Sequence, residues 1–294
     1  METSARIAGV RITHPDRVLD PVLGVRKRDL AEYFAAVARW MMPHVRHRPL
    51  TLVRCPEGHE EGCFYQRHAS RGFPAEVDRV PVVEPDGATE LLVVRRRRGL
   101  VALAQVGVLE VHTWLARIDR PLRPDRVGFD LDPGPEVPWS AVVEAALLLR
   151  ERLRAEGVQA WVKTTGGKGL HLIVPIARRY SFDAARGWAR RVAVALAAAQ
   201  PQRFTLEPRK DARPRRIYVD VLRNAYGASM VAPYSPRARP GLTVSVPVDW
   251  EELATGVDPD AWTIATVPLR LRQQPDPWAA VGRRGQRLPV SESR

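Results

Sequence analysis

The sequence predicts an α/β (α+β) protein with a core sheet flanked by helices. Short apolar segments with strand-like patterning are separated by longer segments in which apolar residues recur every three or four positions, as they do in amphipathic helices. A glycine or a proline follows each long segment, where a helix would end. The expected core strands are 127–133, 159–163, 170–174, 204–206 and 216–222, and the expected helices are 139–156 and 181–199.

The first part of the chain consists of basic strand, loop and turn segments with one clear helix. Apolar residues recur at helical spacing from Leu30 to Met41, and Pro43 then predicts the end of that helix. Further strands are expected at 50–54, 63–68 and 91–94, and a helix at 100–108.

A chain of 294 residues can form one large domain or two coupled subdomains. We expect a single domain over residues 1–275. Its N-terminal basic α/β part would comprise about residues 1–110, and its core about residues 111–275. Residues 276–294 are expected to form a flexible tail.

The net charge of +13 and the excess of Arg over Lys suggest phosphate recognition, so nucleic acid is the expected partner. A GC-rich genome would also enrich Arg. No segment approaches the roughly 18 apolar residues of a membrane span. Residues Met1 to Gly9 lack the apolar core of a signal peptide. We therefore expect a cytoplasmic protein that does not bind membranes.

The two cysteines, Cys55 and Cys63, are too few for a disulfide framework, and none is expected in a reducing compartment. Together with His59 and His68 they suggest zinc. The spacing, however, matches no standard zinc motif. Zinc therefore stays a minor alternative.

Two acidic residues lie near the end of the expected strand at 127–133. Asp130 and Asp132 are separated by one residue, so both side chains would lie on the same face of a strand. Their charges would repel unless a cation or a shared proton lies between them. Carboxylate oxygens favour Mg²⁺ or Mn²⁺. The alternative is that both residues cap the turn at Pro133.

Asp220 interrupts the apolar segment at 216–222. A buried carboxylate without a partner is costly, which makes Asp220 the natural third metal ligand. A salt bridge to Arg223 is the alternative.

The turn at 164–169 contains three glycines and Lys168, so its backbone N–H groups and a positive charge could hold a phosphate. Its spacing is not that of a Walker loop, and a strand follows it instead of a helix. A plain Gly-Gly hairpin is the alternative.

Phe64 and Tyr65 are adjacent, so a strand cannot direct both rings into one core. At least one ring should be exposed beside Arg54, Arg67 and His68, where it could stack on a base. Packing against the other subdomain is the alternative.

Basic groups also gather just before the first helix, in residues 12–17 and 24–28, where they could bind a phosphate. A solvated loop is the alternative.

Four motifs together closely resemble the polymerase domain of bacterial ATP-dependent DNA ligase D, a family of the archaeo-eukaryotic primase superfamily. The resemblance runs in order from about residue 12 to residue 250. Ligase and nuclease domains are absent, so the chain looks like a free-standing homologue or an excised domain. The motifs are residues 129–133 (FDLDP), 165–171 (TGGKGLH), 219–224 (VDVLRN) and 232–239 (APYSPRAR).

This resemblance implies a primase-like fold and a nucleotidyltransferase that extends or fills DNA ends and gaps in non-homologous end joining. It implies two Mn²⁺ or Mg²⁺ ions, NTPs or dNTPs as substrates, and DNA ends or gaps with a 5′-phosphate. A Ku-type end-binding protein and a separate DNA ligase would be partners at the bacterial nucleoid.

The resemblance also assigns roles to individual residues. Asp130 and Asp132 would hold both metals, and Asp220 would complete the site of the ion that activates the primer 3′-OH. Phe64 and Tyr65 would stack on the template. The nucleotide would be bound by His112, Thr165, Lys168, His171, Arg223 and Arg237, and DNA by His14, Arg17, Lys27, Arg54, Phe64, Tyr65, Arg67 and His68.

Four positions depart from the family pattern, and none of them loses a hydrogen-bond donor. Thr165 stands where Ser is usual and His14 where Asn is usual, while Arg17 and Arg67 stand where Lys is usual.

The residues and the resemblance both predict nucleotidyl transfer assisted by two metals, in which the protein positions the substrates and compensates charge. Two other functions stay open: a primase that initiates chains without a primer, and a non-catalytic DNA-end-binding module.

Overall fold

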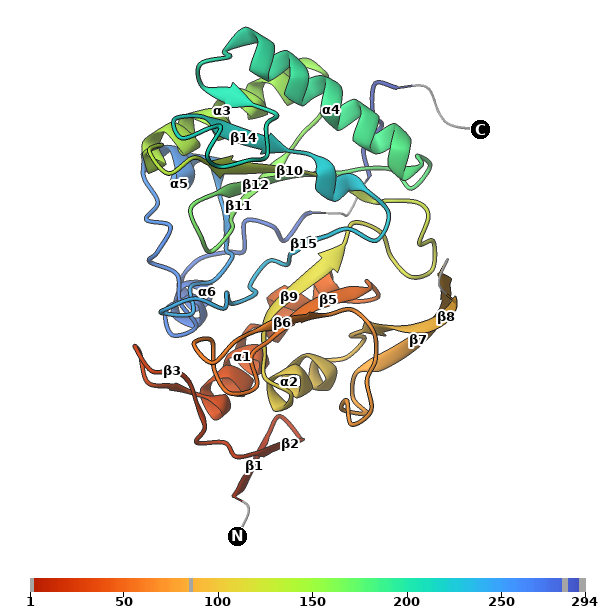
Figure 1. Cartoon of the computed structure of the whole chain (residues 1–294), viewed down its shortest axis with the longest axis vertical. Coiled ribbons are helices and arrows are strands. Elements are labelled where there is room, and N and C mark those ends of the chain that lie inside the picture. The colour runs from red at the N-terminus through yellow and green to blue at the C-terminus, as the bar shows by residue number, and fades with distance from the viewer. Residues whose placement is uncertain (1–2, 85–86, 282–284, 291–294) are drawn as a thin grey trace. The chain divides into compact units, whose positions relative to one another are not determined.

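The computed structural model describes residues 3–84, 87–281 and 285–290. The chain forms two compact units, and both are discontinuous in sequence (Figure 1). The first unit comprises Met1–Trp114, Val231–Val246 and Asp260–Asp276, and the second comprises Leu115–Met230, Pro247–Pro259 and Pro277–Arg294. The predicted change near residue 110 lies close to the first boundary. The prediction of one continuous core over 111–275 is wrong, because two of its segments return to the first unit.

The first unit is built around helix α1 and a small antiparallel sheet. In this sheet β9 pairs with β5 and β5 with β6, and the short strand β15, in which the boundary between the two units falls, lies at the other edge. The core contains the apolar face of α1 together with α2 and α6. The helices are α1 (Lys27–Val45), α2 (Arg97–Gln105) and α6 (Val267–Gln273), and the sheet strands are β5 (Leu50–Arg54), β6 (Phe64–Gln66), β9 (Val108–Trp114) and β15 (Ser229–Val231).

Three two-stranded hairpins complete the first unit: β1 (Ser4–Ile7) with β2 (Val10–Thr13), β3 (Val18–Asp20) with β4 (Val25–Arg26), and β7 (Asp78–Glu84) with β8 (Gly87–Val93).

Helix α1 has the predicted apolar face but continues two residues past Pro43. Pro43 cannot donate to the carbonyl of Arg39, and both residues are exposed, so water can satisfy that carbonyl. The predicted end at Pro43 was therefore early.

The second unit contains a six-stranded sheet in the order β13-β14-β10-β12-β11-β16. All pairs are antiparallel except β13 with β14. The strands are β10 (Arg126–Pro133), β11 (Trp161–Thr164), β12 (Leu170–Pro175), β13 (Phe204–Thr205), β14 (Ile217–Asp220) and β16 (Pro247–Val248), and the helices are α3 (Trp139–Ala155), α4 (Phe182–Ala199), α5 (Trp250–Thr255) and the 3-10 turn η1 (Leu222–Asn224).

Helices α3 and α4 cover one face of this sheet (Figure 1). Phe129 and Leu131 of β10 are fully buried in that core, and the Phe129 ring lies 5.8 Å from the Trp188 ring of α4. Because side chains alternate along a strand, Asp130 and Asp132 lie on the opposite face. The predicted α/β core is confirmed.

For the described residues after 276, the prediction of a flexible tail is wrong. Trp278 is buried and its indole N–H donates to the Val162 carbonyl at 2.9 Å, and Leu288 is also buried. Such apolar anchors order a chain end. Residues 282–284 and 291–294, which were also part of the predicted tail, lie outside the described residues.

Asn224 extends the sheet beyond the end of β14. Its buried amide accepts a hydrogen bond from the Gly128 N–H at 2.8 Å and donates to the Gly128 carbonyl at 2.7 Å. It also donates to the Val221 carbonyl at 2.9 Å. The side chain therefore takes the place of a neighbouring strand for β10.

Replacing Asn224→Ala should lower the free energy of unfolding by roughly 2 to 4 kcal/mol, because two buried backbone groups of Gly128 lose their partner. Urea unfolding measures this directly. Leu222→Ala, on the exposed side of the same turn, should change stability by less than about 0.5 kcal/mol. Equal effects of the two changes would contradict the bridging role of Asn224.

Candidate active site

Four charged or titratable residues form one row across four neighbouring strands of the second unit. Asp220 of β14 is opposite Asp130 of β10, Asp130 is opposite His171 of β12, and His171 is opposite Lys163 of β11. Directly opposed residues in antiparallel strands project to the same face. The row lies on the face that α3 and α4 do not cover.

The environment shifts the pKa values of the two carboxylates in opposite directions. Burial opposes ionisation of Asp130, but the charges of His171, 3.4 Å away, and of Lys163 outweigh it, so its pKa is lowered. The pKa of Asp220 is raised by burial, and the negative charge of Asp130 adds to this effect. A neighbouring pair with such opposed shifts is typical of functional sites.

Asp220 also has three stabilising partners. It accepts a hydrogen bond from the Leu222 N–H at 2.7 Å, and Arg223 Nε lies 3.7 Å from its carboxylate. The hydroxyl of Tyr218 bonds the same carboxylate. Burial and the charge of Asp220 raise the pKa of Tyr218 to about 12, which keeps this donor protonated at neutral pH.

Asp132 lies two residues along β10, opposite Tyr218. Its carboxylate is 2.5 Å from Arg213 Nη2, and Arg213 Nη1 donates to its carbonyl at 2.6 Å. Arg213 is 1% exposed, whereas the Asp132 side chain is 41% exposed. Within the described part of the chain, no group of three His, Cys, Asp or Glu side chains is therefore arranged around a common metal position.

The glycine-rich turn between β11 and β12 is braced by Thr165. Its hydroxyl accepts from the N–H groups of Gly167 at 3.2 Å and Gly169 at 3.3 Å, and it donates to the Gly169 carbonyl at 3.1 Å. A Cβ atom at Gly169 would lie 2.5 Å from the Leu131 carbonyl oxygen, so only glycine fits there. Lys168 is exposed at the tip. The geometry favours the hairpin interpretation of these glycines.

His112 and Arg237 lie in the first unit, where both contact Glu110. Glu110 Oε2 is 2.8 Å from His112 Nε2 and 3.0 Å from Arg237 Nε, and Oε1 accepts from the Ala238 N–H at 2.9 Å. Burial alone would raise the pKa of Glu110. The hydrogen bond with His112 and the charge of Arg237 instead lower it from 4.5 to about 2.

Both predicted stacking rings are exposed on β6, Phe64 by 47% and Tyr65 by 74%. The Arg54 guanidinium lies 5.2 Å from the Phe64 ring and donates to the Gln66 side chain at 2.7 Å. His68 Nδ1 is 2.9 Å from the Thr89 hydroxyl. Arg67 is exposed. Arg54 therefore lies on β5, Phe64 and Tyr65 lie on the neighbouring strand β6, and Arg67 directly follows β6.

The three basic residues before α1 lie close together through the backbone, since the Lys27 N–H donates to the Arg17 carbonyl at 2.8 Å. Lys27 Nζ is buried and donates to the Thr13 carbonyl at 2.9 Å. Arg17 pairs with Glu57 at 2.5 Å. His14 adopts a left-handed conformation with φ of 48°. Much of the charge expected to bind a phosphate is therefore engaged within the protein.

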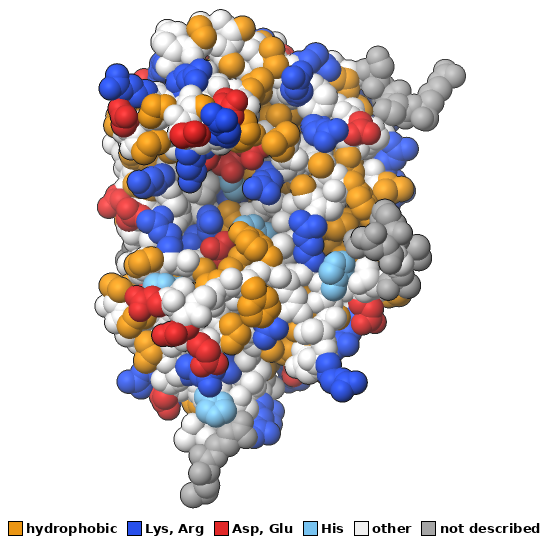
Figure 2. All heavy atoms as spheres, viewed as in Figure 1, with side chains coloured by type: hydrophobic (Ala, Val, Ile, Leu, Met, Phe, Trp, Pro, Cys, Tyr) orange, Lys and Arg blue, Asp and Glu red, His pale blue; other side chains and the backbone are white. Residues whose placement is uncertain are grey.

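Lys and Arg side chains are spread over the face shown in Figure 2, with Asp and Glu among them. None of the helices in the described ranges combines the length and apolar character needed to span a membrane.

Cys55 and Cys63 form a disulfide, which contradicts the expectation of none. Arg54 and Phe64 are opposite each other in the β5–β6 hairpin. Cys55, which follows Arg54, and Cys63, which precedes Phe64, therefore face each other as well. The zinc alternative is not supported, because His59 lies near Asp20 and His68 contacts Thr89. The spacing in the sequence did not reveal the hairpin that joins the cysteines.

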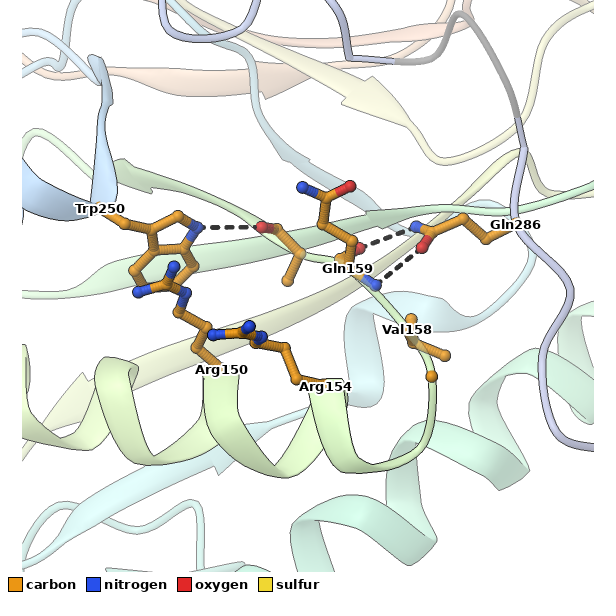
Figure 3. A pocket seen from close by; sticks show the side chains of 8 residues that line it. Arg150, Arg154, Val158, Gln159, Trp250 and Gln286 are labelled. Atoms are coloured by element: carbon orange, nitrogen blue, oxygen red, sulfur yellow. Dashed lines mark hydrogen bonds between the residues drawn. The ribbon is translucent and has the colours of Figure 1, made fainter.

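The second unit also has a pocket of about 450 Å³ between α3 and the start of β11 (Figure 3). The Arg150 guanidinium lies 4.9 Å from the Trp250 ring, and the Trp250 indole donates to the Ala160 carbonyl. Arg154 pairs with Glu151 at 3.4 Å. Arg154 lies in the last turn of α3, where the helix dipole favours a cation. No predicted site residue lines this pocket.

The sequence interpretation missed Lys163, Arg213, Tyr218 and Glu110. Lys163 could have been found, because a hairpin closed at 164–169 sets it opposite His171. Tyr218 follows from its spacing of two from Asp220 in a strand. Glu110 likewise follows from its spacing of two from His112, whereas Arg213 lies in a loop and had no local signal.

Residues 26–278 match the family model described as the LigD primase-polymerase domain. The chain belongs to this LigD family. The predicted family is confirmed. The multifunctional non-homologous end joining protein LigD of Pseudomonas aeruginosa is 41% identical over 293 residues, covering 99% of the chain and 35% of that protein.

The bifunctional LigD of Bacillus subtilis is 28% identical over 283 residues, covering 96% of the chain and 46% of that protein. The chain thus spans about a third to a half of the length of these curated relatives. The solved polymerase domain of Mycobacterium tuberculosis ligase D, in complex with DNA, superposes with a TM-score of 0.85 at 32% identity, covering 92% of this chain and 96% of that one. The chain therefore has the fold of a LigD polymerase domain.

Glu110→Gln should make the stability of the folded chain less sensitive to acid. Because the folded pKa of Glu110 is below its ordinary value, its stabilising effect is complete above about pH 5 and is lost as the pH falls from 4.5 toward 2. The shift corresponds to roughly 3 kcal/mol. Urea unfolding of both proteins between pH 7 and pH 3 should show a gap that narrows with acid, and a constant gap would contradict this.

Proposed function

We propose that the chain is a DNA-dependent nucleotidyltransferase of the primase-polymerase type that extends or fills DNA ends and gaps in non-homologous end joining or related repair. The observation that carries this is the row of Asp220, Asp130, His171 and Lys163 on one face of the sheet. The likeness to a polymerase domain solved with DNA supports it. Templated addition of NTPs or dNTPs is the proposed reaction.

A pair of Mn²⁺ or Mg²⁺ ions is the proposed cofactor, because Asp130 and Asp220 offer the oxygen donors that these ions prefer. Asp130 and Asp220 bring hard oxygen donors together, and burial together with the charge of Asp130 raises the pKa of Asp220. Asp130 and Asp132 would hold both ions, and Asp220 would complete one site. Bound ions would lower the pKa of the attacking 3′-hydroxyl and neutralise charge on the leaving pyrophosphate. To hold the ions, Asp132 would have to release the contact of its carboxylate with Arg213.

Positive side chains of the second unit would compensate the charge of the triphosphate. His171 and Lys163 lie in the row itself, Arg223 lies beside Asp220, and Lys168 is exposed at the adjacent turn. Thr165 would act by holding that turn in shape. His112 and Arg237 would bind the same nucleotide. Preorganised charge of this kind is the main contribution a protein makes to phosphoryl transfer.

The first unit would hold the DNA. Phe64 and Tyr65 offer exposed rings for template bases, flanked by Arg54, Arg67 and His68. His14, Arg17 and Lys27 would receive a downstream 5′-phosphate. A Ku-type protein and a separate DNA ligase at the bacterial nucleoid in the cytoplasm would be its partners.

Asp220→Asn should reduce primer extension in Mn²⁺ by about 100-fold or more, because a carboxylate that compensates metal charge is lost. Binding to primed DNA should stay nearly unchanged. Asp119→Asn is the matched control, since Asp119 is an exposed partner of Arg178 in the same unit. Reactions with ribo- and deoxyribonucleotides, with and without a primer, distinguish extension from priming. Wild-type protein that binds DNA but adds no nucleotide would refute the proposed function.

Tyr65→Ala and Phe64→Ala should each weaken binding to gapped DNA with an unpaired template base by about 1 to 3 kcal/mol, because a stacking ring is removed. Fluorescence anisotropy of labelled DNA measures this. Leu269→Ala removes an exposed apolar side chain of α6 in the same unit and should have no effect. An equal loss on intact duplex DNA would argue against template stacking.

A further inference from the structure

Glu110 is a buried carboxylate that joins three separate groups of the first unit. It lies on β9 between the fully buried residues Leu109 and Val111, and it is itself only 7% exposed. One of its oxygens contacts both His112 and Arg237, and the other accepts the N–H of Ala238. A buried carboxylate is tolerated only when it is paired and hydrogen-bonded in this way.

The geometry of β9 explains why these groups meet. Glu110 and His112 are two residues apart on a strand, so they share a face. The segment that carries Arg237 is fixed along the same strand, because the Ala232 N–H donates to the Val111 carbonyl at 2.9 Å and the Ser235 hydroxyl accepts from the Val111 N–H at 2.8 Å. Glu110 adds an ionic link to this backbone docking.

We propose that Glu110 is a positioning residue, which orients His112 and Arg237 to bind the phosphates of an incoming nucleoside triphosphate. This inference rests on the proposed function. The shared carboxylate oxygen bonds the imidazole ring and holds the guanidinium beside it as an ion pair before the nucleotide arrives. Side chains held in the binding geometry lose less entropy when the ligand binds.

Glu110 contacts Arg237 at Nε. At this position the carboxylate can hold the guanidinium without blocking a phosphate from its terminal nitrogens. A guanidinium carries five N–H donors, so a carboxylate at Nε can coexist with a phosphate at the terminal nitrogens. The carboxylate is also anchored by the Ala238 N–H, which holds it in place when the nucleotide binds. A carboxylate that competed with the phosphates would instead weaken nucleotide binding.

Two variants distinguish the effect of the negative charge of Glu110 from the effect of its side-chain shape. Glu110→Gln keeps an acceptor for the Ala238 N–H, but its amide group would direct donors at the donors of His112 and Arg237. We expect the KM for the nucleotide in primer extension to rise about ten-fold, as for other residues that orient a ligand-binding side chain, while kcat changes by less than about three-fold. Glu110→Asp keeps the charge and should restore part of the affinity.

Asp20→Asn is a matched control in the same unit. Asp20 is fully buried, lies 3.6 Å from His59, and accepts N–H groups from Val22 and Gly241. It therefore also joins a histidine and the segment 231–246. Its loss should destabilise the fold in a similar way but leave the KM for the nucleotide unchanged.

A double variant tests whether Glu110 acts through Arg237. Arg237→Ala should raise KM, and adding Glu110→Gln should raise it by less than about two-fold more. Direct binding of a fluorescent nucleoside triphosphate without primer gives a second measurement that does not need catalysis. There Glu110→Gln should weaken binding about ten-fold.

Three results would overturn the inference: an unchanged KM and binding constant in Glu110→Gln, a lower KM, or equal shifts in Glu110→Gln and Asp20→Asn. Wild-type protein that binds the fluorescent nucleotide but extends no primer would refute the proposed function, and the binding measurements would still decide the role of Glu110. If Glu110→Gln does not fold, Arg237→Lys, which keeps the charge but loses the Nε contact, should show the same rise in KM.

Discussion

The antiparallel register of β10 and β14 fixes two carboxylates, Asp130 and Asp220, directly opposite each other. Like charges in this arrangement destabilise a sheet, and burial increases the cost. The other face of the same strands offsets it, because Phe129, Leu131 and Val219 are fully buried in the core beneath α3 and α4. The apolar core therefore holds together two groups that would separate in water.

Two buried carboxylates of the chain show how surroundings decide protonation. Burial is the largest influence on both Asp220 and Glu110, and in both it opposes ionisation. Glu110 is bonded by His112, Arg237 and a backbone N–H, and its pKa falls to about 2. Asp220 faces another carboxylate, and its pKa rises. The charge of Glu110 is therefore balanced within the protein, whereas Asp130 and Asp220 place two carboxylates opposite each other.

Local patterns predicted the parts of the site that depend on alternation along a strand. The shared face of Asp130 and Asp132, the burial of Phe129 and the strand containing Asp220 all follow from a period of two. Contacts between distant segments left no such pattern. The return of residues 231–246 to the first unit depends on bonds such as that from the Tyr33 hydroxyl to the Tyr234 carbonyl, 201 residues away. The pairing of Asp132 with Arg213, 81 residues away, was hidden for the same reason.

The glycine-rich turn at 165–169 shows that one motif can combine two separate demands. Gly169 is required because the turn passes against the Leu131 carbonyl, and the N–H groups of Gly167 and Gly169 are bonded to the Thr165 hydroxyl. These glycines therefore serve packing, and their N–H groups are not directed at a ligand. Lys168 is exposed at the tip of the turn, and His171 lies opposite Asp130. Glycine gives this turn its close approach to β10, the strand that carries Asp130 and Asp132.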